Sequence, residues 1–319
     1  MTATAPVAAA VHRSRPEPTE QRRFHRVRRR SVGDVPPLNP RLQLVRAAIT
    51  MLCVLSLGLV LHLAVTSRLQ HRTAQERAYS TFRAQLAQGT APAGPVDFEN
   101  NVVELGAPVA YLEIPTIGLS EVVAQGTSAT MLFDGPGHRR DTPLPGQIGV
   151  SILIGRRAAY GGPFGDIGEL VADDLIIVTT GQGVFEYRVI GVRREGDQLP
   201  PALEPGSARL VLATADGRAF LPSGVLRVDA DITSTPVGGQ PRLVTDDTLP
   251  KEERLMAVDG SSLWVLVLWL QAMIVLSVAA VWGWHRWGRP QTWVAFGPPL
   301  ALVGMATAGE IARLLPNLI

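Results

Sequence analysis

Cysteine is almost absent from this sequence. The only one, Cys53, lies inside a long hydrophobic run. A single thiol cannot form an intrachain disulfide, so the chain is not built on a disulfide framework. No cofactor or metal site is expected from the remaining residues.

An excess of basic residues is also missing from the middle of the chain. Residues 68–262 contain 17 Lys or Arg and 24 Asp or Glu, a balance of −7 (17 basic minus 24 acidic). The overall pI of about 9.0 comes from residues 1–46, which carry ten Arg against three acids. This distribution offers no basic surface for nucleic acid, and no nucleic-acid partner is expected. The basic tail, residues 1–46, has no apolar periodicity and is predicted to be disordered.

Three runs without charged residues indicate membrane-spanning helices. They are residues 47–67, 263–284 and 292–309. About 20 apolar residues cross a bilayer as a helix. The first run begins too far into the chain for a signal peptide and lacks its cleavage site, so we expect it to remain as an anchor. The basic tail and the loop with Arg286 and Arg289 favour the cytoplasmic side. The sequence therefore predicts a multi-pass protein of the cell membrane, in contact with membrane lipids, with residues 68–262 outside.

The region between the first two runs divides into three parts. Residues 68–107 begin with a helical stripe that ends at the breaker Gly89, and they predict a stalk helix followed by a linker. Residues 108–232 consist of short β-rich runs separated by turn signals, which is typical of an all-β barrel or sandwich. Residues 233–262, rich in Pro, Gly and acids, predict a linker back to the membrane.

The β-rich region contains four motifs in a specific order and spacing. They are Leu112-Glu-Ile-Pro-Thr-Ile-Gly-Leu119, Asp134-Gly-Pro-Gly-His138 with Leu144-Pro-Gly-Gln-Ile-Gly149, Ile154-Gly-Arg-Arg-Ala-Ala-Tyr-Gly-Gly-Pro-Phe164, and the hairpin from Asp173 to Tyr187. On these motifs residues 108–232 resemble the sortase family, in particular its class E type from actinobacteria. The resemblance implies an eight-stranded β-barrel on the outer face of a Gram-positive membrane. It also implies an activity that cuts a sorting signal and passes the acyl group to an amine.

The residues that carry this activity in the family are replaced in this chain. Arg156 stands where the family's Gly-His-Arg loop has its histidine, and Ala215 stands where the cysteine is expected. The family's arginine falls on or near Val225, with Arg227 two residues away. The chemistry needs a thiolate nucleophile, and a methyl group cannot attack a carbonyl. The resemblance therefore implies a pseudoenzyme, a catalytically inactive sortase-like protein that serves as an extracellular binding or scaffolding module in a cell-envelope membrane complex.

A barrel without its nucleophile can keep its groove, which we expect to be open at Ala215. The candidate groove-binding residues are Arg156, Arg157, Tyr160, Thr214, Asp216 and Arg227. Two adjacent guanidiniums, Arg156 and Arg157, are suited to hold a carboxylate or phosphate. In the alternative interpretation, Arg156 fills the vacated imidazole site and pairs with Asp216. The expected partner is another membrane or envelope protein, or a peptide in the groove.

A second hypothesis is an acyl-transfer or hydrolytic enzyme with a nucleophile other than cysteine. Hydroxyls are present at Thr214, Ser223 and Ser151, with His138 as the base and Asp216 to orient it. Nothing in the sequence spacing favours this arrangement.

Overall fold

A computed structural model describes residues 60–97, 99, 101–241, 243–258, 260 and 263–319, with a few isolated positions before residue 60. Apart from such positions, the predicted disordered tail, residues 1–46, lies outside the described residues, as does much of the predicted span 47–67. All elements discussed below belong to one compact unit, residues 49–319.

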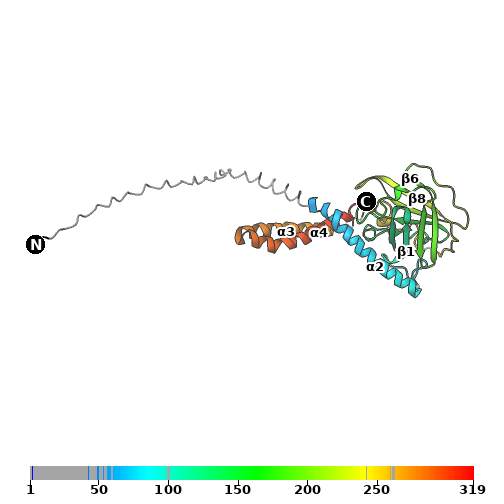
Figure 1. Cartoon of the computed structure of the whole chain (residues 1–319), viewed down its shortest axis with the longest axis horizontal. Helices are drawn as coiled ribbons and strands as arrows, with labels where there is room; N and C mark the ends of the chain where they lie inside the picture. The colour runs from blue at the N-terminus through cyan, green and yellow to red at the C-terminus, as the bar shows by residue number, and fades with distance from the viewer. Residues whose placement is uncertain are drawn as a thin grey trace. The chain divides into compact units, whose positions relative to one another are not determined.

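The β-rich region forms a closed barrel of eight strands, visible in Figure 1. The strands are β1 (Pro108–Ile114), β2 (Leu119–Gln125), β3 (Gly137–His138), β4 (Gly149–Ile154), β5 (Leu175–Thr180), β6 (Gly183–Arg193), β7 (Ala208–Arg218) and β8 (Leu221–Ile232). Their order around the barrel is β1-β2-β3-β4-β7-β8-β6-β5. The predicted all-β barrel is confirmed, and the sandwich alternative is wrong.

Strand alternation explains where the core lies. In β5 partly buried and fully buried positions alternate, and Ile176 and Val178 point into the barrel. Strand β7 differs, because its first eight residues are all buried. Leu210 and Leu212 belong to the barrel core, whereas Ala213 and Ala215 on the opposite face belong to a second apolar cluster. The outer face of β7 is therefore covered by other parts of the chain.

The helix after the first predicted span lies on the barrel. Helix α2 (Ser67–Gln88) ends at Gly89, whose left-handed φ of 69° is the common helix-terminating geometry for glycine. The amide of Gln75 accepts from Val122 N–H (2.7 Å) and donates to Val122 O (3.1 Å) on β2. Phe82 of the same helix is also buried. The segment expected to act as a stalk is therefore packed against the domain it precedes.

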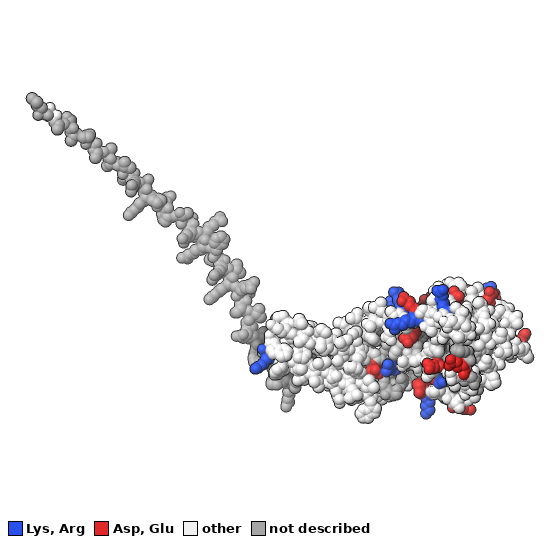
Figure 2. Space-filling view, turned by 90° about the horizontal axis from the view of Figure 1, so that it is seen from below, with Lys and Arg blue, Asp and Glu red and all other residues white. Residues whose placement is uncertain are grey.

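Two apolar helices follow the barrel and pack against each other: α3 (Leu263–Trp287) and α4 (Arg289–Arg313). Leu263–Gly283 and Pro290–Arg313, of 21 and 24 residues, are long and apolar enough to cross a membrane. Gly288, with a φ of 94°, makes the tight connection between them. In Figure 2 the surface of this helix pair is white apart from blue atoms at its tip, whereas red and blue atoms gather over the barrel. The helix pair is thus a candidate membrane anchor.

We predict that Tyr187→Phe destabilises the barrel by about 1–3 kcal/mol, because it leaves a buried donor without a partner. The N–H of buried Gly146 donates to the Tyr187 hydroxyl at 2.6 Å. The matched control is Tyr79→Phe on the exposed side of α2, which should change the free energy of unfolding by less than about 0.5 kcal/mol. Urea unfolding of both variants checks this. Equal stability losses would contradict it.

Candidate functional site

Strand register brings positions 156, 215 and 225 together. Strands β4 and β7 run parallel with Ile154 opposite Ala213, so the residues that follow β4 lie beside the later part of β7. Gly155 N–H donates to Ala213 O (3.1 Å), and the Thr214 hydroxyl donates to Gly155 O (2.9 Å). On the other side of β7, Ala215 pairs directly with Val225 of β8. The sequence motifs therefore located one site on the barrel.

Ala215 belongs to a buried apolar cluster, and the barrel residues of this cluster form the site that Leu318 fills. We call it the Ala215 groove; its wall residues are Leu132, Ile154, Ala213, Ala215 and Val225. Leu318, from the segment that follows α4, packs into this cluster, and Ala215 is only 2% exposed. The expectation of an open groove at Ala215 is wrong, because a distant part of the same chain covers it.

Arg156 sits at the edge of the Ala215 groove with its side chain fully buried (0% exposed). Its guanidinium donates to the carbonyl oxygens of Ile319 (2.6 Å) and Ala129 (3.2 Å). It also lies over the rings of Phe133 and Tyr160, at 4.6 and 5.3 Å from their centroids. Burial lowers the pKa of Arg156 to about 10. Its surroundings are carbonyl oxygens and aromatic faces, so the group serves as a buried donor.

The other candidate residues have separate partners. Arg157 donates to Ala215 O (2.8 Å), which ties it to β7. Asp216 pairs with Arg194 at 3.4 Å, so the pairing of Asp216 with Arg156 is wrong. Arg227 lies opposite Ala213 on β8, on the same face of the strand as Val225. Burial and the charge of Arg193 lower the pKa of Arg227.

Tyr160 shapes the site through its backbone and its ring. It holds a left-handed φ of 52°, which is unusual for a residue with a side chain. This conformation accompanies stacking of its ring on Phe133, at 4.0 Å between centroids. Burial raises the pKa of Tyr160. The Arg156 guanidinium contacts both rings.

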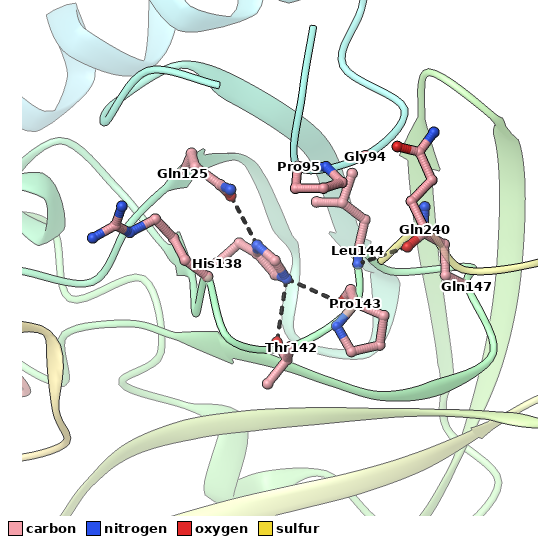
Figure 3. Close-up of a pocket in the computed structure, with 10 residues that line it drawn as sticks. Gly94, Pro95, Gln125, His138, Thr142, Pro143, Leu144, Gln147 and Gln240 are labelled. Carbon is pink, nitrogen blue, oxygen red and sulfur yellow. Dashed lines mark hydrogen bonds between the residues drawn. The ribbon is translucent and has the colours of Figure 1, made fainter. Parts of the chain in front are cut away.

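His138 belongs to a different pocket and is fully engaged there, as Figure 3 shows. Its Nδ1 lies 2.8 Å from the Gln125 side chain, and its Nε2 lies 3.0 Å from Pro143 O. Burial lowers the pKa of His138 to about 4. The pocket is lined by Gly94, Pro95, Gln125, His138, Arg140, Thr142, Pro143, Leu144, Gln147 and Gln240. With both nitrogens occupied, His138 holds strands and loops together.

The hydroxyl-based arrangement drawn from the sequence is not assembled. Thr214 is buried, and its hydroxyl already donates a hydrogen bond to Gly155 O. His138 is held by Gln125 and Pro143, and Asp216 by Arg194. Within the described part of the chain, no group of three or more His, Cys, Asp or Glu side chains could hold a metal ion.

Sequence reasoning missed the residues that cover the site. They are Asn317, Leu318 and Ile319, in the segment 314–319 after α4. The one available signal was the apolar run Leu314-Leu-Pro-Asn-Leu-Ile319, which continues beyond the charged pair Glu310 and Arg313. An apolar run beside a predicted span is readily assigned to the membrane, so its contact with the barrel was not foreseen.

Comparison with known proteins assigns the barrel to a family. Residues 112–219 match the family model described as Sortase domain. The barrel is a sortase-like domain. Helices α3 and α4 and the segment 314–319 lie outside the matched residues.

Individual relatives of the sortase-like domain include more than one type of sortase. Sortase D of Bacillus subtilis is 29% identical over 129 residues, which cover 39% of this chain and 63% of that protein. The solved Clostridium perfringens Sortase D5 transpeptidase has a TM-score of 0.43 and 18% identity, covering 51% of this chain and 99% of that chain. Sortase E from Streptomyces avermitilis has a TM-score of 0.36 and 28% identity, covering 47% and 99%. This chain thus spans 63% of the length of the Bacillus relative.

We predict that His138 makes the sortase-like domain less stable in acid. Its folded pKa of about 4 lies below its ordinary value of 6.5, so the unfolded chain takes up the proton first as the pH falls. Stability from the neutral ring is present above pH 6.5 and is lost as the pH falls towards 4, by about 3 kcal/mol in total.

Urea unfolding at pH 7 and pH 4.5 should therefore show a smaller loss of stability in His138→Gln than in the parent chain. Both chains contain the same carboxylates, so the contribution of these groups to the pH dependence of stability cancels when the two chains are compared. The same pH dependence in both would contradict the burial of a neutral His138.

Proposed function

We propose that this chain is a catalytically inactive, class E-like sortase homologue of the cell membrane, whose barrel acts as an extracellular binding or scaffolding module. The proposal rests mainly on Ala215. Its methyl group lies where the paired strands β4, β7 and β8 meet. Transpeptidation by a sortase requires a thiolate there and an imidazole to serve the leaving group. Ala215 and Arg156 supply neither.

The groove is better suited to binding than to cleavage. Its wall is apolar, and the buried guanidinium of Arg156 points donors at peptide carbonyl oxygens. These are features of a site that recognises a peptide by its backbone and by apolar side chains. A retained groove of this kind favours a protein or peptide ligand.

Two C-terminal helices support a role within a membrane complex. An enzyme that only needs tethering requires one span, whereas α3 and α4 offer a further apolar surface for another membrane protein. We propose that the partner is such a protein, in the envelope of a Gram-positive actinobacterium. The barrel then lies outside and the helix connection at Gly288, flanked by Arg286 and Arg289, lies in the cytoplasm.

The first test of the function is an assay for turnover. We expect the purified chain to release no product from sorting-signal peptides, with or without an amine acceptor, because no thiolate is present. The double substitution Ala215→Cys with Arg156→His is the informative comparison, since it returns two of the family's groups. Turnover by the parent chain that disappears in Thr214→Val would overturn the proposal in favour of a hydroxyl nucleophile.

Topology is tested separately with introduced cysteines in a Cys53→Ala background. Leu199→Cys lies in an exposed loop of the barrel, 75% exposed, and should react with an impermeant maleimide in intact cells. Arg286→Cys, exposed at the end of α3, should react only after permeabilisation. Reaction of both in intact cells would contradict a membrane-spanning helix pair in this orientation.

A further inference from the structure

The segment 314–319 leaves α4 and enters the Ala215 groove of the same chain. Asn317, Leu318 and Ile319 are all buried, although they lie in no helix or strand. Irregular segments usually remain on the surface because their backbone groups need hydrogen-bond partners. Burial of this segment therefore requires partners on the barrel.

Backbone hydrogen bonds from the site meet that requirement. The N–H of Arg157 donates to Leu318 O (2.9 Å), and the Arg156 guanidinium donates to Ile319 O (2.6 Å). Two successive carbonyls of the segment are thus held by two successive residues of the loop after β4. The Ile319 N–H donates to Pro316 O (3.1 Å), so the segment is bound as a turn whose backbone oxygens are held independently of its side chains.

Side chains add selectivity to this backbone contact. Leu318 packs against Ala215 and Val225, and the small methyl of Ala215 belongs to the surface that receives it. The Asn317 side-chain nitrogen donates to Thr127 O (3.1 Å) and to Arg254 O (2.8 Å). The amide side chain of Asn317 is thus held beside the Ala215 groove, and the branched side chain of Leu318 lies inside it.

We infer that the Ala215 groove is a peptide-binding site and that residues 317–319 are its resident intramolecular ligand. The ligand class is a peptide in a turn conformation, with a polar amide residue followed by two branched apolar residues. This inference rests on the proposed function in that the groove binds peptides without cleaving them, and it names the ligand. A partner peptide of the same class gains access only when the resident segment leaves.

Tethering makes the resident segment a strong competitor. A ligand attached to its own receptor acts at an effective concentration that reaches the millimolar range when the connection is short. Here the connection is α4, whose Ala312 packs with Phe133 and Tyr160 beside the Ala215 groove. An outside peptide therefore competes poorly while α4 is docked.

Accessibility of the Ala215 groove can be measured with a thiol placed inside it. The parent for this test is the full chain with Cys53→Ala and Ala215→Cys, and the readout is its rate of alkylation by a small maleimide. Adding Leu318→Ala removes the side chain that covers position 215 and should raise that rate about tenfold or more. The matched control, Leu315→Ala, makes the same change at a half-buried position of the segment and should leave the rate within about twofold.

Equal rates in the Leu318→Ala and Leu315→Ala chains would overturn the inference. So would an alkylation rate that rises on dilution of the parent, because protection by another molecule depends on concentration whereas protection in cis does not. Both readouts report occupancy of the groove. They are unaffected by whether the chain turns over a substrate, so failure here is distinct from failure of the proposed function.

A binding experiment tests the ligand class directly and does not depend on the introduced thiol. A fluorescent, capped peptide with the sequence of residues 314–319 should bind saturably to a chain shortened to end at Leu315. It should bind at least about tenfold more weakly to the full chain, where the resident segment competes. A scrambled peptide is the control for apolar adhesion.

The contribution of Arg156 is measured in the shortened chain. Arg156→Met should weaken binding of the peptide about tenfold or more, because a donor to a peptide carbonyl is lost. Arg194→Met removes a guanidinium that pairs with Asp216 and should have little effect. No binding of the peptide to the shortened chain, or equal binding of the scrambled peptide, would overturn the inference.

Discussion

The burial of the Arg156 guanidinium is the constraint on which the rest of the site depends. Moving a cation out of water costs several kcal/mol of hydration free energy, which surrounding polar groups must offset. Here that role falls to two carbonyl oxygens, of Ala129 and Ile319, and to the faces of Phe133 and Tyr160. These four residues come from three separate stretches of the chain. Placing arginine at this position therefore organises the loop before β3, the loop after β4 and the segment after α4 around one charge.

The substitution at position 215 complements the one at position 156. A thiolate at the end of β7 would need a polar neighbourhood and access for a substrate. A methyl group needs neither, and it can be closed over by Ile154, Val225 and Leu318. A methyl group at position 215 thus allows an apolar seal on the outer face of β7. Ala215 and Arg156 thus both contact the segment 314–319, through Leu318 and Ile319.

The strands of the barrel could be predicted from the sequence because the alternation of apolar and polar residues is a local signal. Alternation in β5 follows from neighbouring residues, whereas the parallel pairing of β4 with β7 that places residue 156 beside residue 215 joins distant parts of the chain and was implied only by the family resemblance. The two-residue strand β3 carries no such pattern, because it is too short to alternate. Burial of Ala215 was equally out of reach, since it depends on Leu318, more than one hundred residues away. Packing of α2 on the barrel likewise rests on Gln75, a polar residue that a hydrophobic pattern does not reveal.

Asn317 connects the groove to the membrane anchor. Its backbone N–H donates to Ala257 O (2.9 Å), and its side chain donates to Arg254 O (2.8 Å), so the residues before α3 and after α4 are joined directly. The same side chain also donates to Thr127 O on the barrel. Both ends of the helix pair are therefore fastened at one point beside the site.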